Sequence, residues 1–343
     1  MCENGDIGFY RQDKNTGQIE KINFGLDDKA FYSIVGSGNY FLFDQRENCV
    51  WTVTNKLFKL DLETQQLVSP SNVTFSLTNS TYNPLILLAN GHIFYGNTLD
   101  KLSVFNPETK QDVYISIQGT EALRGIKTRC FYQKSDNQVW IGTESNGIYL
   151  IDLNGTILKH YHINSRSSLS NNDILYLHQD DKSLWAATLG GGLNKIDLKT
   201  NEIHVYNKLN GLPDNNVVSI LEDQEKLWLA TYSGLTCFDK SKETFQTFFQ
   251  EDGLTHNEFN YSSSYMSKDG QMYFGGMNGI NSFSPSDLAK SQLSPALKLT
   301  KFVKHDQRLD SLVETDYIND HHSQIVIGPS ISFFSLNGLY RNI

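Results

Sequence analysis

The chain has 343 residues, 38 of them acidic and 29 basic, which gives a formal net charge of −9. This balance argues against a nucleic-acid-binding surface, because such a surface needs clustered lysine and arginine. The sequence contains no apolar run of the length that spans a membrane. Nor does it begin with the charged and apolar regions of a signal peptide.

The first element in chain order is residues 1–24, which contain two short alternating runs, Gly8-FYRQD and Gln18-IEKINF. Both runs match the second half of a longer unit that recurs later, for example at Gly147-IYLID. We therefore expect residues 1–24 to form the outer two strands of a sheet whose inner strands come from upstream or elsewhere. We also expect the chain to be part of a longer protein.

From residue 25 onward a unit of about 45 residues repeats six times. Its best copy starts at the aromatic Trp185, has a small residue at Ala187 and a glycine at Gly192, and alternates apolar and polar residues up to Asp197. The units are predicted at 25–70, 71–117, 118–163, 164–207, 208–250 and 251–286, with anchoring aromatics at Trp51, Phe94, Trp140, Trp185, Trp228 and Tyr273.

Each unit contains four short runs with a period of two, separated by turns rich in glycine, asparagine, aspartate and serine. Four strands in about 45 residues are typical of a propeller blade. The sequence therefore predicts an all-β protein, a β-propeller with seven blade positions and an incomplete N-terminal blade. The aromatic and the small residue two positions later are interpreted as packing between blades, as at Trp140 and Gly142.

The C-terminal part has a different texture. Residues 287–294 are predicted as a linker, and residues 295–343 lose the repeat. The segment Gln324-IVIGPSISFFSLNGLY is typical of two strands of a β-sandwich, so residues 295–343 are predicted to begin an Ig-like domain.

Catalytic and metal sites are not favoured by the motifs. The carboxylate pairs Asp180-Asp181 and Glu222-Asp223 occupy the same position in successive units, and Asx turns explain them. His160 and His162 share a strand face and could hold a metal, but an exposed edge strand with polar side chains is the preferred interpretation. The four cysteines (Cys2, Cys49, Cys130 and Cys237) show no metal-ligand spacing. No catalytic residue, metal or cofactor is assigned.

Ligand binding is better supported, because loops on a rigid scaffold are where recognition is usually placed. In a propeller blade the connection between blades and the turn between the second and third strands reach the same face. Amides, carboxylates and rings in these loops suit a sugar, although asparagine also caps strand starts in ordinary loops. The candidate ligand-binding residues are Glu144, Asn146, Asn171, Asn172, Asp214, Asn215, Tyr232, His256, Asn257, Phe259, Asn260 and Asn278.

The repeats at Trp140, Trp185, Trp228 and Tyr273 resemble the two-component regulator propeller repeat, as do the segments Leu169-SNNDILYL and Leu212-PDNNVVSILED that precede two of them. The tail from Ser294 resembles the start of a triple-tyrosine Ig-like domain. The units at Trp51 and Phe94 depart from the pattern, with Lys56 and Lys101 near the expected glycine.

This resemblance implies the periplasmic sensor region of a bacterial hybrid histidine kinase, anchored in the inner membrane by parts beyond this sequence. The leading hypothesis is a non-catalytic sensor of a small-molecule or oligosaccharide ligand, with an oligosaccharide favoured. The alternatives are an interaction module, which docks a second propeller of the same polypeptide or a homodimer partner, and a propeller lyase or glycosidase.

Overall fold

A computed structural model describes residues 9–12, 16, 18–22, 24–25, 40–74, 82–118, 120–286, 301–306 and 311–316. The chain divides into two compact units, Met1–Pro285 and Ser286–Ile343, and each is described by itself.

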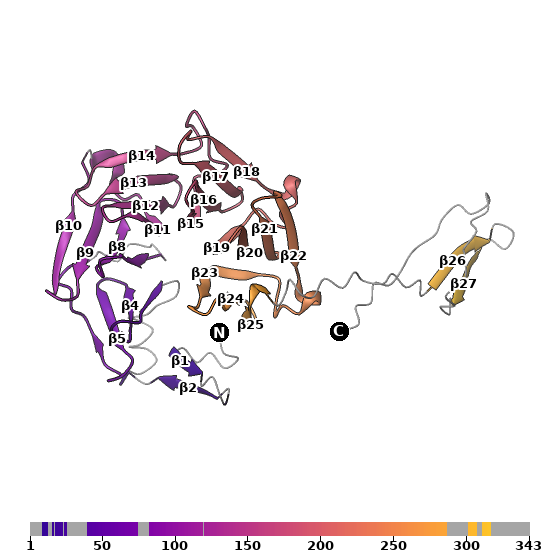
Figure 1. Ribbon diagram of the computed structural model, residues 1–343, viewed down its shortest axis with the longest axis horizontal. Helices are drawn as coiled ribbons and strands as arrows, with labels where there is room; N and C mark the ends of the chain where they lie inside the picture. Colours follow the sequence, from indigo (N-terminus) through magenta and orange to yellow (C-terminus); the bar gives the residue numbers. More distant parts are fainter. Residues whose placement is uncertain are drawn as a thin grey trace. The chain divides into compact units, whose positions relative to one another are not determined.

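The first unit is a β-propeller whose sheets are arranged around a common axis (Figure 1). Five sheets have four strands each. The first blade contains β3 (Phe41–Asp44), β4 (Cys49–Val53), β5 (Leu57–Asp61) and β6 (Leu67–Val68), and the second contains β7 (Leu85–Leu87), β8 (Ile93–Thr98), β9 (Lys101–Asn106) and β10 (Gln111–Ile115). The third contains β11 (Thr128–Ser135), β12 (Gln138–Thr143), β13 (Ile148–Asp152) and β14 (Ile157–Tyr161), the fourth β15 (Ile174–Gln179), β16 (Ser183–Thr188), β17 (Gly192–Asp197) and β18 (Ile203–Tyr206), and the fifth β19 (Val217–Asp223), β20 (Lys226–Thr231), β21 (Gly234–Asp239) and β22 (Thr244–Phe248). A sixth sheet contains β23 (Phe259–Met266), β24 (Met272–Gly276) and β25 (Gly279–Phe283). The prediction of an all-β propeller is confirmed.

Every sheet is an antiparallel meander in which neighbouring strands are consecutive in the chain. The first strand of each blade lies nearest the axis, and the innermost strands β11, β15, β19 and β23 contact one another in sequence. Short 3-10 turns occur at Thr120–Leu123, Lys208–Asn210 and Gln250–Asp252. Because each blade is a local hairpin array, the repeated sequence unit and the repeated structural unit coincide.

The core lies between the blades. One hydrophobic cluster joins Trp140 and Ile148 of the third blade to Ile174 and Ala186 of the fourth. Similar clusters bridge the first and second, the second and third, and the fourth and fifth blades. Complete burial of such large apolar side chains contributes about 1.5–3 kcal/mol each. The anchoring aromatics of the first five blades are at most 2% exposed, as the packing interpretation expected. Tyr273 of the sixth blade is only half-buried, and its neighbour Phe274 is the buried ring there.

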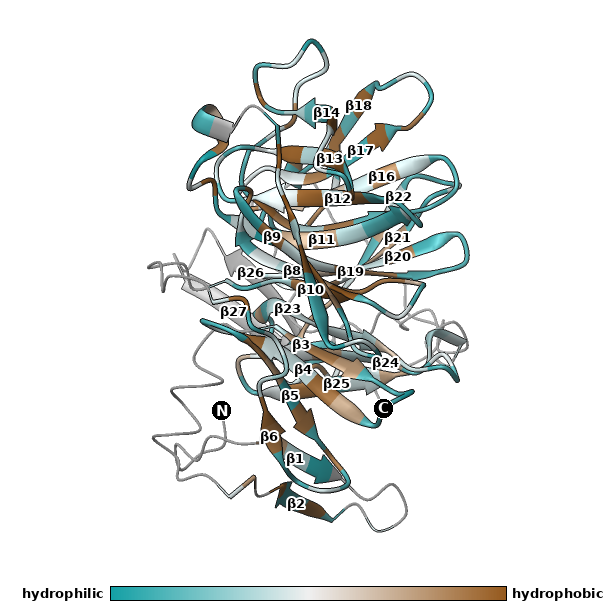
Figure 2. Ribbon diagram, turned by 90° about the vertical axis from the view of Figure 1, so that its left-hand side faces the viewer, coloured by the Kyte–Doolittle hydropathy of each residue, from teal (hydrophilic) through white to brown (hydrophobic). Residues whose placement is uncertain are grey.

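The small residue two positions after the aromatic permits this close approach. A Cβ atom added at Gly142 would lie 2.5 Å from Sγ of Cys130 and 2.7 Å from Cγ2 of Ile174 in the next blade. Figure 2 shows the resulting pattern along the chain, with apolar residues concentrated in the strands and hydrophilic residues in the turns. The Trp-x-small motif is therefore a packing motif.

The repeated glycine at the start of the third strand has a separate backbone role. Gly192 has φ of 82°, and a Cβ there would lie 2.2 Å from the carbonyl oxygen of Tyr206. Only glycine adopts this conformation without strain and leaves room for the neighbouring strand. The glycine of the repeat therefore fixes the geometry of the turn between the second and third strands.

The N-terminal residues form a two-stranded antiparallel ribbon of β1 (Phe9–Gln12) and β2 (Ile19–Ile22). The Phe9 ring meets the Phe41 ring edge-on at 4.9 Å between centroids, and Phe24 belongs to a cluster with Val50 and Leu60. The ribbon therefore packs on the first blade. The inner strands that would complete a seventh blade stay a prediction.

The second unit contains an antiparallel hairpin of β26 (Lys301–Asp306) and β27 (Ser311–Asp316). The predicted linker at 287–294 and the sandwich-like segment from Gln324 to Tyr340 lie outside the described residues, so the Ig-like domain stays a prediction. Within the described ranges, no helix has the length and apolar character that crossing a membrane requires.

Candidate functional site

Backbone hydrogen bonds hold the two kinds of loop on one face, as the sequence predicted. The N–H of Leu189, in the turn between the second and third strands, donates to the carbonyl of Asp173 in the connection between blades at 3.0 Å. The same bond recurs from Glu144 to the carbonyl of Lys127 at 3.0 Å. These paired loops form the loop face of the propeller.

The three residues before each of the innermost strands β15, β19 and β23 build this face by a repeated pattern. The first residue closes a turn by accepting the N–H two positions later. The acceptor is Oδ1 in Asn171 and Asp214, at 2.8 and 2.7 Å, and Nδ1 in His256, at 3.0 Å. These three predicted site residues therefore have structural partners, which matches the strand-capping alternative.

The second residue is an asparagine that ties neighbouring blades together. Oδ1 of Asn172 accepts the N–H of Ile163 at 2.9 Å, and its carbonyl accepts the N–H of Gly147 at 2.8 Å. Asn215 repeats both bonds with Lys208 and Gly192, and Asn257 repeats them with Gln250 and Gly234. We call Asn172, Asn215 and Asn257 the inter-blade asparagines.

The remaining predicted residues are placed differently. Phe259 was predicted to stack on a ligand, and this was wrong: its ring is 1% exposed and packs on Phe274 at 6.2 Å between centroids. Phe259 is the first residue of β23 and points into the core. Asn146 and Asn278 stay in turns of the loop face, where Asn146 is half-buried and Asn278 is exposed. Asn260 is exposed as well, but it is the second residue of β23, and its amide donates to the carbonyl of Gly276 at 3.3 Å.

An aromatic row crosses the loop face beside the axis, and Tyr232 is the predicted residue that belongs to it. The ring of Tyr261 lies 5.9 Å from that of Tyr232 and 6.0 Å from that of Tyr82, and the hydroxyls of Tyr232 and Tyr261 are hydrogen-bonded. The guanidinium of Arg129 lies over Tyr82 at 4.3 Å. The row, defined as Tyr82, Tyr232, Tyr261 and Arg129, brings together four different blades.

Ion pairs surround this row. Nε of Arg129 lies 2.9 Å from Oδ1 of Asp173, and Nζ of Lys127 lies 3.4 Å from Oε2 of Glu144. Burial raises the pKa of Asp173, against the opposing influence of Arg129. The pKa of Tyr232 is raised as well, by burial and then by its hydrogen bond to Tyr261. Tyr232 therefore stays a neutral phenol, and Arg129, the cation of the row, is paired with Asp173.

An axial cavity of about 450 Å³ lies along the innermost strands, a volume in the usual range for ligand pockets. Its polar lining includes Tyr40, Tyr132, Tyr176, His178 and Ser262. Burial is the main cause of the raised pKa of Tyr40, and Arg129 and Tyr82 of the aromatic row also act on this hydroxyl. Tyr40 therefore lines the cavity and also lies close to Arg129 and Tyr82 of the aromatic row.

Sequence reasoning missed Tyr82, Tyr261, Arg129 and the cavity lining. A signal was present in the innermost strands, where tyrosine, serine and histidine replace the apolar residues that packing alone would favour. The run Tyr261-SSSY and the pair Tyr176 and His178 are examples. Such polar residues at the axis mark the surface that faces the cavity.

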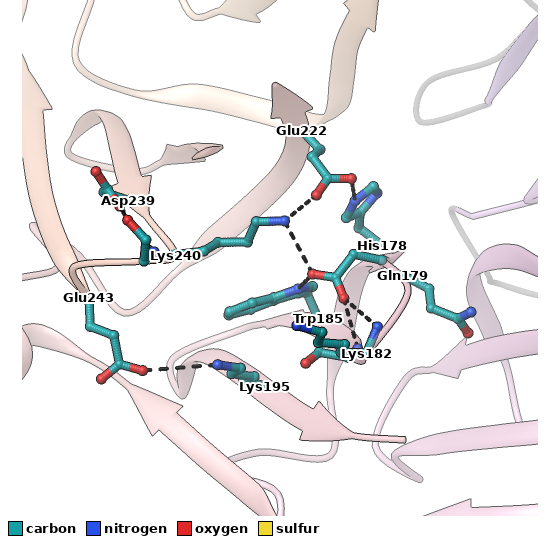
Figure 3. A network of polar contacts seen from close by, with 12 residues as sticks. His178, Gln179, Lys182, Trp185, Lys195, Glu222, Asp239, Lys240 and Glu243 are labelled. Atoms are coloured by element: carbon teal, nitrogen blue, oxygen red, sulfur yellow. Dashed lines mark hydrogen bonds and ion pairs between the residues drawn. The ribbon is translucent and has the colours of Figure 1, made fainter. Parts of the chain in front are cut away.

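At the other end of β15 and β19, a polar network joins two blades (Figure 3). Nε2 of His178 lies 2.9 Å from Oε2 of Glu222, and Nζ of Lys240 contacts both Glu222 and Asp180. Asp180 accepts the backbone N–H groups of Lys182 and Ser183, which confirms its Asx turn. Glu222 was assigned to the same kind of turn, and this was wrong, because its carboxylate bridges His178 and Lys240 instead.

The histidine pair on the outer strand has structural partners. Nε2 of His160 lies 2.8 Å from the carbonyl oxygen of Asn146, and its ring stacks on Tyr149 at 3.9 Å. Burial lowers the pKa of His160. Across the described residues, no three histidine, cysteine or acidic side chains gather as a metal site would require.

Comparisons with known proteins place these features in context. Residues 211–233 match the family model described as the two component regulator propeller. The chain is 31% identical over 302 residues to the histidine kinase P4 of Formosa agariphila, and the match covers 85% of this chain and 18% of that protein. The chain therefore spans less than a fifth of the length of this curated relative.

Two solved structures are similar in fold. A catalytically inactive variant of virginiamycin B lyase from Staphylococcus aureus, with quinupristin, is 14% identical with a TM-score of 0.58, over 78% of this chain and 85% of that one. The extracellular domain of a protein assigned as a hybrid two component system from B. thetaiotaomicron is 20% identical with a TM-score of 0.47, over 94% and 50%. At these identities the lyase shares the propeller fold alone.

Proposed function

The chain carries the repeat of the two component regulator propeller family, and on this premise we propose that it is the ligand-sensing extracytoplasmic region of a two-component signalling protein. The relative from Formosa agariphila, which is named as a histidine kinase, supports this assignment. A periplasmic location follows from the same proposal. Any kinase activity then belongs to other parts of the longer protein.

The aromatic row is the observation that carries the ligand proposal. Tyr232 and Tyr261 present ring faces and hydroxyls on the same face of a rigid scaffold. Rings stack on the apolar face of a sugar, while hydroxyls, amides and carboxylates meet its hydroxyl groups. We therefore propose an oligosaccharide as the ligand, bound across the loop face beside Tyr82. Exposed Asn260 and Asn278 lie on the same face and supply further polar contacts.

The proposed role is binding without catalysis. A sensor needs its ligand to prefer one arrangement of the assembly over another. The propeller is tied together by the inter-blade asparagines, so the ligand acts by changing contacts outside the blades. Incubation of the protein with each oligosaccharide, followed by chromatography, is expected to return the sugar uncleaved. Release of shorter or unsaturated products would instead support a propeller glycosidase or lyase.

A thermal-shift panel of defined oligosaccharides tests binding. A ligand at a hundred times its dissociation constant stabilises the folded state by about 2.7 kcal/mol, which raises the melting temperature by several degrees. The Tyr261→Ala variant should lose this response. Tyr265→Ala is the matched control, because Tyr265 is 49% exposed on the same strand and lies outside the aromatic row.

An interaction module is the second candidate. Val113 and Tyr114 are adjacent on the outer strand β10 and are 61% and 52% exposed. Such apolar groups on an outer edge favour contact with another protein surface. The partner is proposed as a second propeller of the same polypeptide or a homodimer partner. Sedimentation that depends on protein concentration and is abolished by Tyr114→Lys would favour this role.

A further inference from the structure

We infer that the loop-face site selects neutral oligosaccharides and rejects polyanionic ones such as uronate or sulfated chains. This inference rests on the proposed function and specifies its ligand class. It is carried by the charge pairing around the aromatic row, because a site for a polyanion needs cations that are free to meet the ligand.

The guanidinium of Arg129 already contacts two other groups of the protein, the carboxylate of Asp173 and the ring of Tyr82. Its Nη2 donates a hydrogen bond to Oδ2 of Asp173 at 3.3 Å, and its Nε lies 2.9 Å from Oδ1 as an ion-pair contact. The guanidinium also covers the ring of Tyr82 at 4.3 Å. The Arg129 side chain is 7% exposed and that of Asp173 is 16% exposed. An anionic ligand group could reach Arg129 only by displacing Asp173, which would leave a buried carboxylate without its partner. Arg129 is therefore a positioning residue for Tyr82.

Lys127 is the second cation near the row, and it is paired as well. Its Nζ lies 3.4 Å from Oε2 of Glu144, while Oε1 of Glu144 lies 3.9 Å from Nη2 of Arg129. The backbone N–H of Glu144 also donates to the carbonyl of Lys127 at 3.0 Å, which fixes the two residues side by side. Glu144 thus shields both cations.

The other charged groups of the described loops on this face leave a negative balance of two. They are four cations and six carboxylates: Lys56, Arg124, Arg166 and Lys208 against Asp100, Glu121, Asp214, Glu251, Asp252 and Glu258. The field of the Glu258 carboxylate helps to raise the pKa of Tyr232, after burial and the bond to Tyr261. A polyanion would meet this carboxylate, whereas a neutral sugar would use it as a hydrogen-bond acceptor.

The test compares neutral and acidic oligosaccharides of equal length by calorimetric titration at two salt concentrations. Neutral gluco- or xylo-oligosaccharides are expected to bind at least tenfold more tightly than oligogalacturonates, with little effect of salt, since exposed ion pairs are screened by salt and neutral contacts are not. Acidic chains that bind as tightly as neutral ones would overturn the inference and leave the sensor proposal standing. If no sugar binds, both fall.

Removing the shielding carboxylate provides a gain-of-function arm. Glu144→Gln should increase affinity for oligogalacturonates about tenfold at low salt, so that the ratio of neutral to acidic affinity falls. Glu225→Gln removes the same charge from an exposed position outside the described site and should leave this ratio as it is in the parent. Unchanged binding of acidic chains by Glu144→Gln would contradict the pairing argument. Glu144 is 32% exposed, so this variant is expected to fold.

Discussion

Asn172 and Gly147 are bonded across two blades: the N–H of Gly147 donates to the carbonyl of Asn172 at 2.8 Å. The side chain of the same asparagine holds the N–H of Ile163, in the connection that leaves the third blade, at 2.9 Å. One residue therefore fastens the end of one blade to the beginning of the next. The same arrangement recurs at Asn215 and Asn257.

The first prediction concerns these inter-blade asparagines. Asn215→Ala should lower the free energy of unfolding by about 1–2 kcal/mol, because the N–H of Lys208 loses its acceptor. Urea denaturation measures this change. Asn164→Ala, at an exposed position in another connection, should change stability by less than about 0.5 kcal/mol. Equal effects of the two substitutions would show that the Asn215 bond contributes nothing.

The second prediction concerns the close approach at Gly142. Gly142→Ala places a methyl group 2.5 Å from Sγ of Cys130 and 2.7 Å from Cγ2 of Ile174, so the third and fourth blades must separate. We expect destabilisation by about 1–3 kcal/mol, as in other overpacked cores. In urea denaturation, adding Cys130→Ala to Gly142→Ala should cost less than the sum of the two single substitutions. Strict additivity would contradict the contact.

The third prediction concerns acid stability through Asp180. Burial opposes ionisation of its carboxyl, but the Trp185 indole, the N–H groups of Lys182 and Ser183 and the Lys240 ammonium outweigh burial and lower its pKa below 3.8. A lowered folded-state pKa contributes stability above pH 3.8 that is lost as the pH falls through the folded-state value.

The corresponding measurement is urea denaturation between neutral pH and pH 2. Asp180→Asn should be less stable than the parent at neutral pH, and the difference should shrink on acidification. Asp136→Asn, at an exposed turn, should run parallel to the parent. A difference for Asp180→Asn that stays constant down to pH 2 would contradict the assigned shift.

The fourth prediction separates the ring of Tyr232 from its hydroxyl. Tyr232→Phe keeps the stacking surface and removes the hydroxyl, which bonds Tyr261 in the free protein and is proposed to meet a sugar hydroxyl in the complex. Sugar affinity should therefore fall about threefold to tenfold, which corresponds to the loss of one hydrogen bond. Tyr232→Ala removes the ring as well and should reduce affinity further. Calorimetric titration with the neutral chain measures both. If Phe and Ala variants bind as the parent does, the ligand lies elsewhere.

The fifth prediction concerns the thiols of the propeller. Burial raises the pKa of Cys237 to about 11 and the pKa values of Cys130 and Cys49 to about 12. Since the thiolate is the reactive form, all three should resist alkylation at neutral pH and react in urea. A Cys2→Ser background removes the one cysteine that lies outside the described residues. Rapid labelling of folded protein in this background would contradict their burial.

The propeller could be predicted because its information is local and repeated. The Trp185, Ala187 and Gly192 spacing encodes packing, close approach and a turn within a few residues, and each role is visible in the structure. The loops of the loop face were predicted for the same reason, since strand order fixes which turns share an end. Because the same pattern occurs six times, the scaffold could be predicted from the sequence.

The candidate site could be predicted only in part. It depends on residues that are not part of the repeat and that come together only because the blades are arranged around one axis. Tyr82 and Tyr261 are far apart in the chain and meet across the axis. The prediction for Phe259 was wrong because a difference of one residue in where β23 begins decides whether this side chain lies in the loop or in the strand. Glu222 was misassigned because its partners come from other parts of the fold, His178 on another strand and Lys240 in the turn after β21.

The bond from Gly147 to Asn172 means that two successive blades do not depend on the covalent connection alone to remain neighbours. A protease cut in the exposed segment between Ile163 and Leu169 would leave both sides attached through main-chain hydrogen bonds and buried apolar surface. New chain ends can therefore be introduced in that segment, and the third and fourth blades should still assemble when they are made as two separate chains.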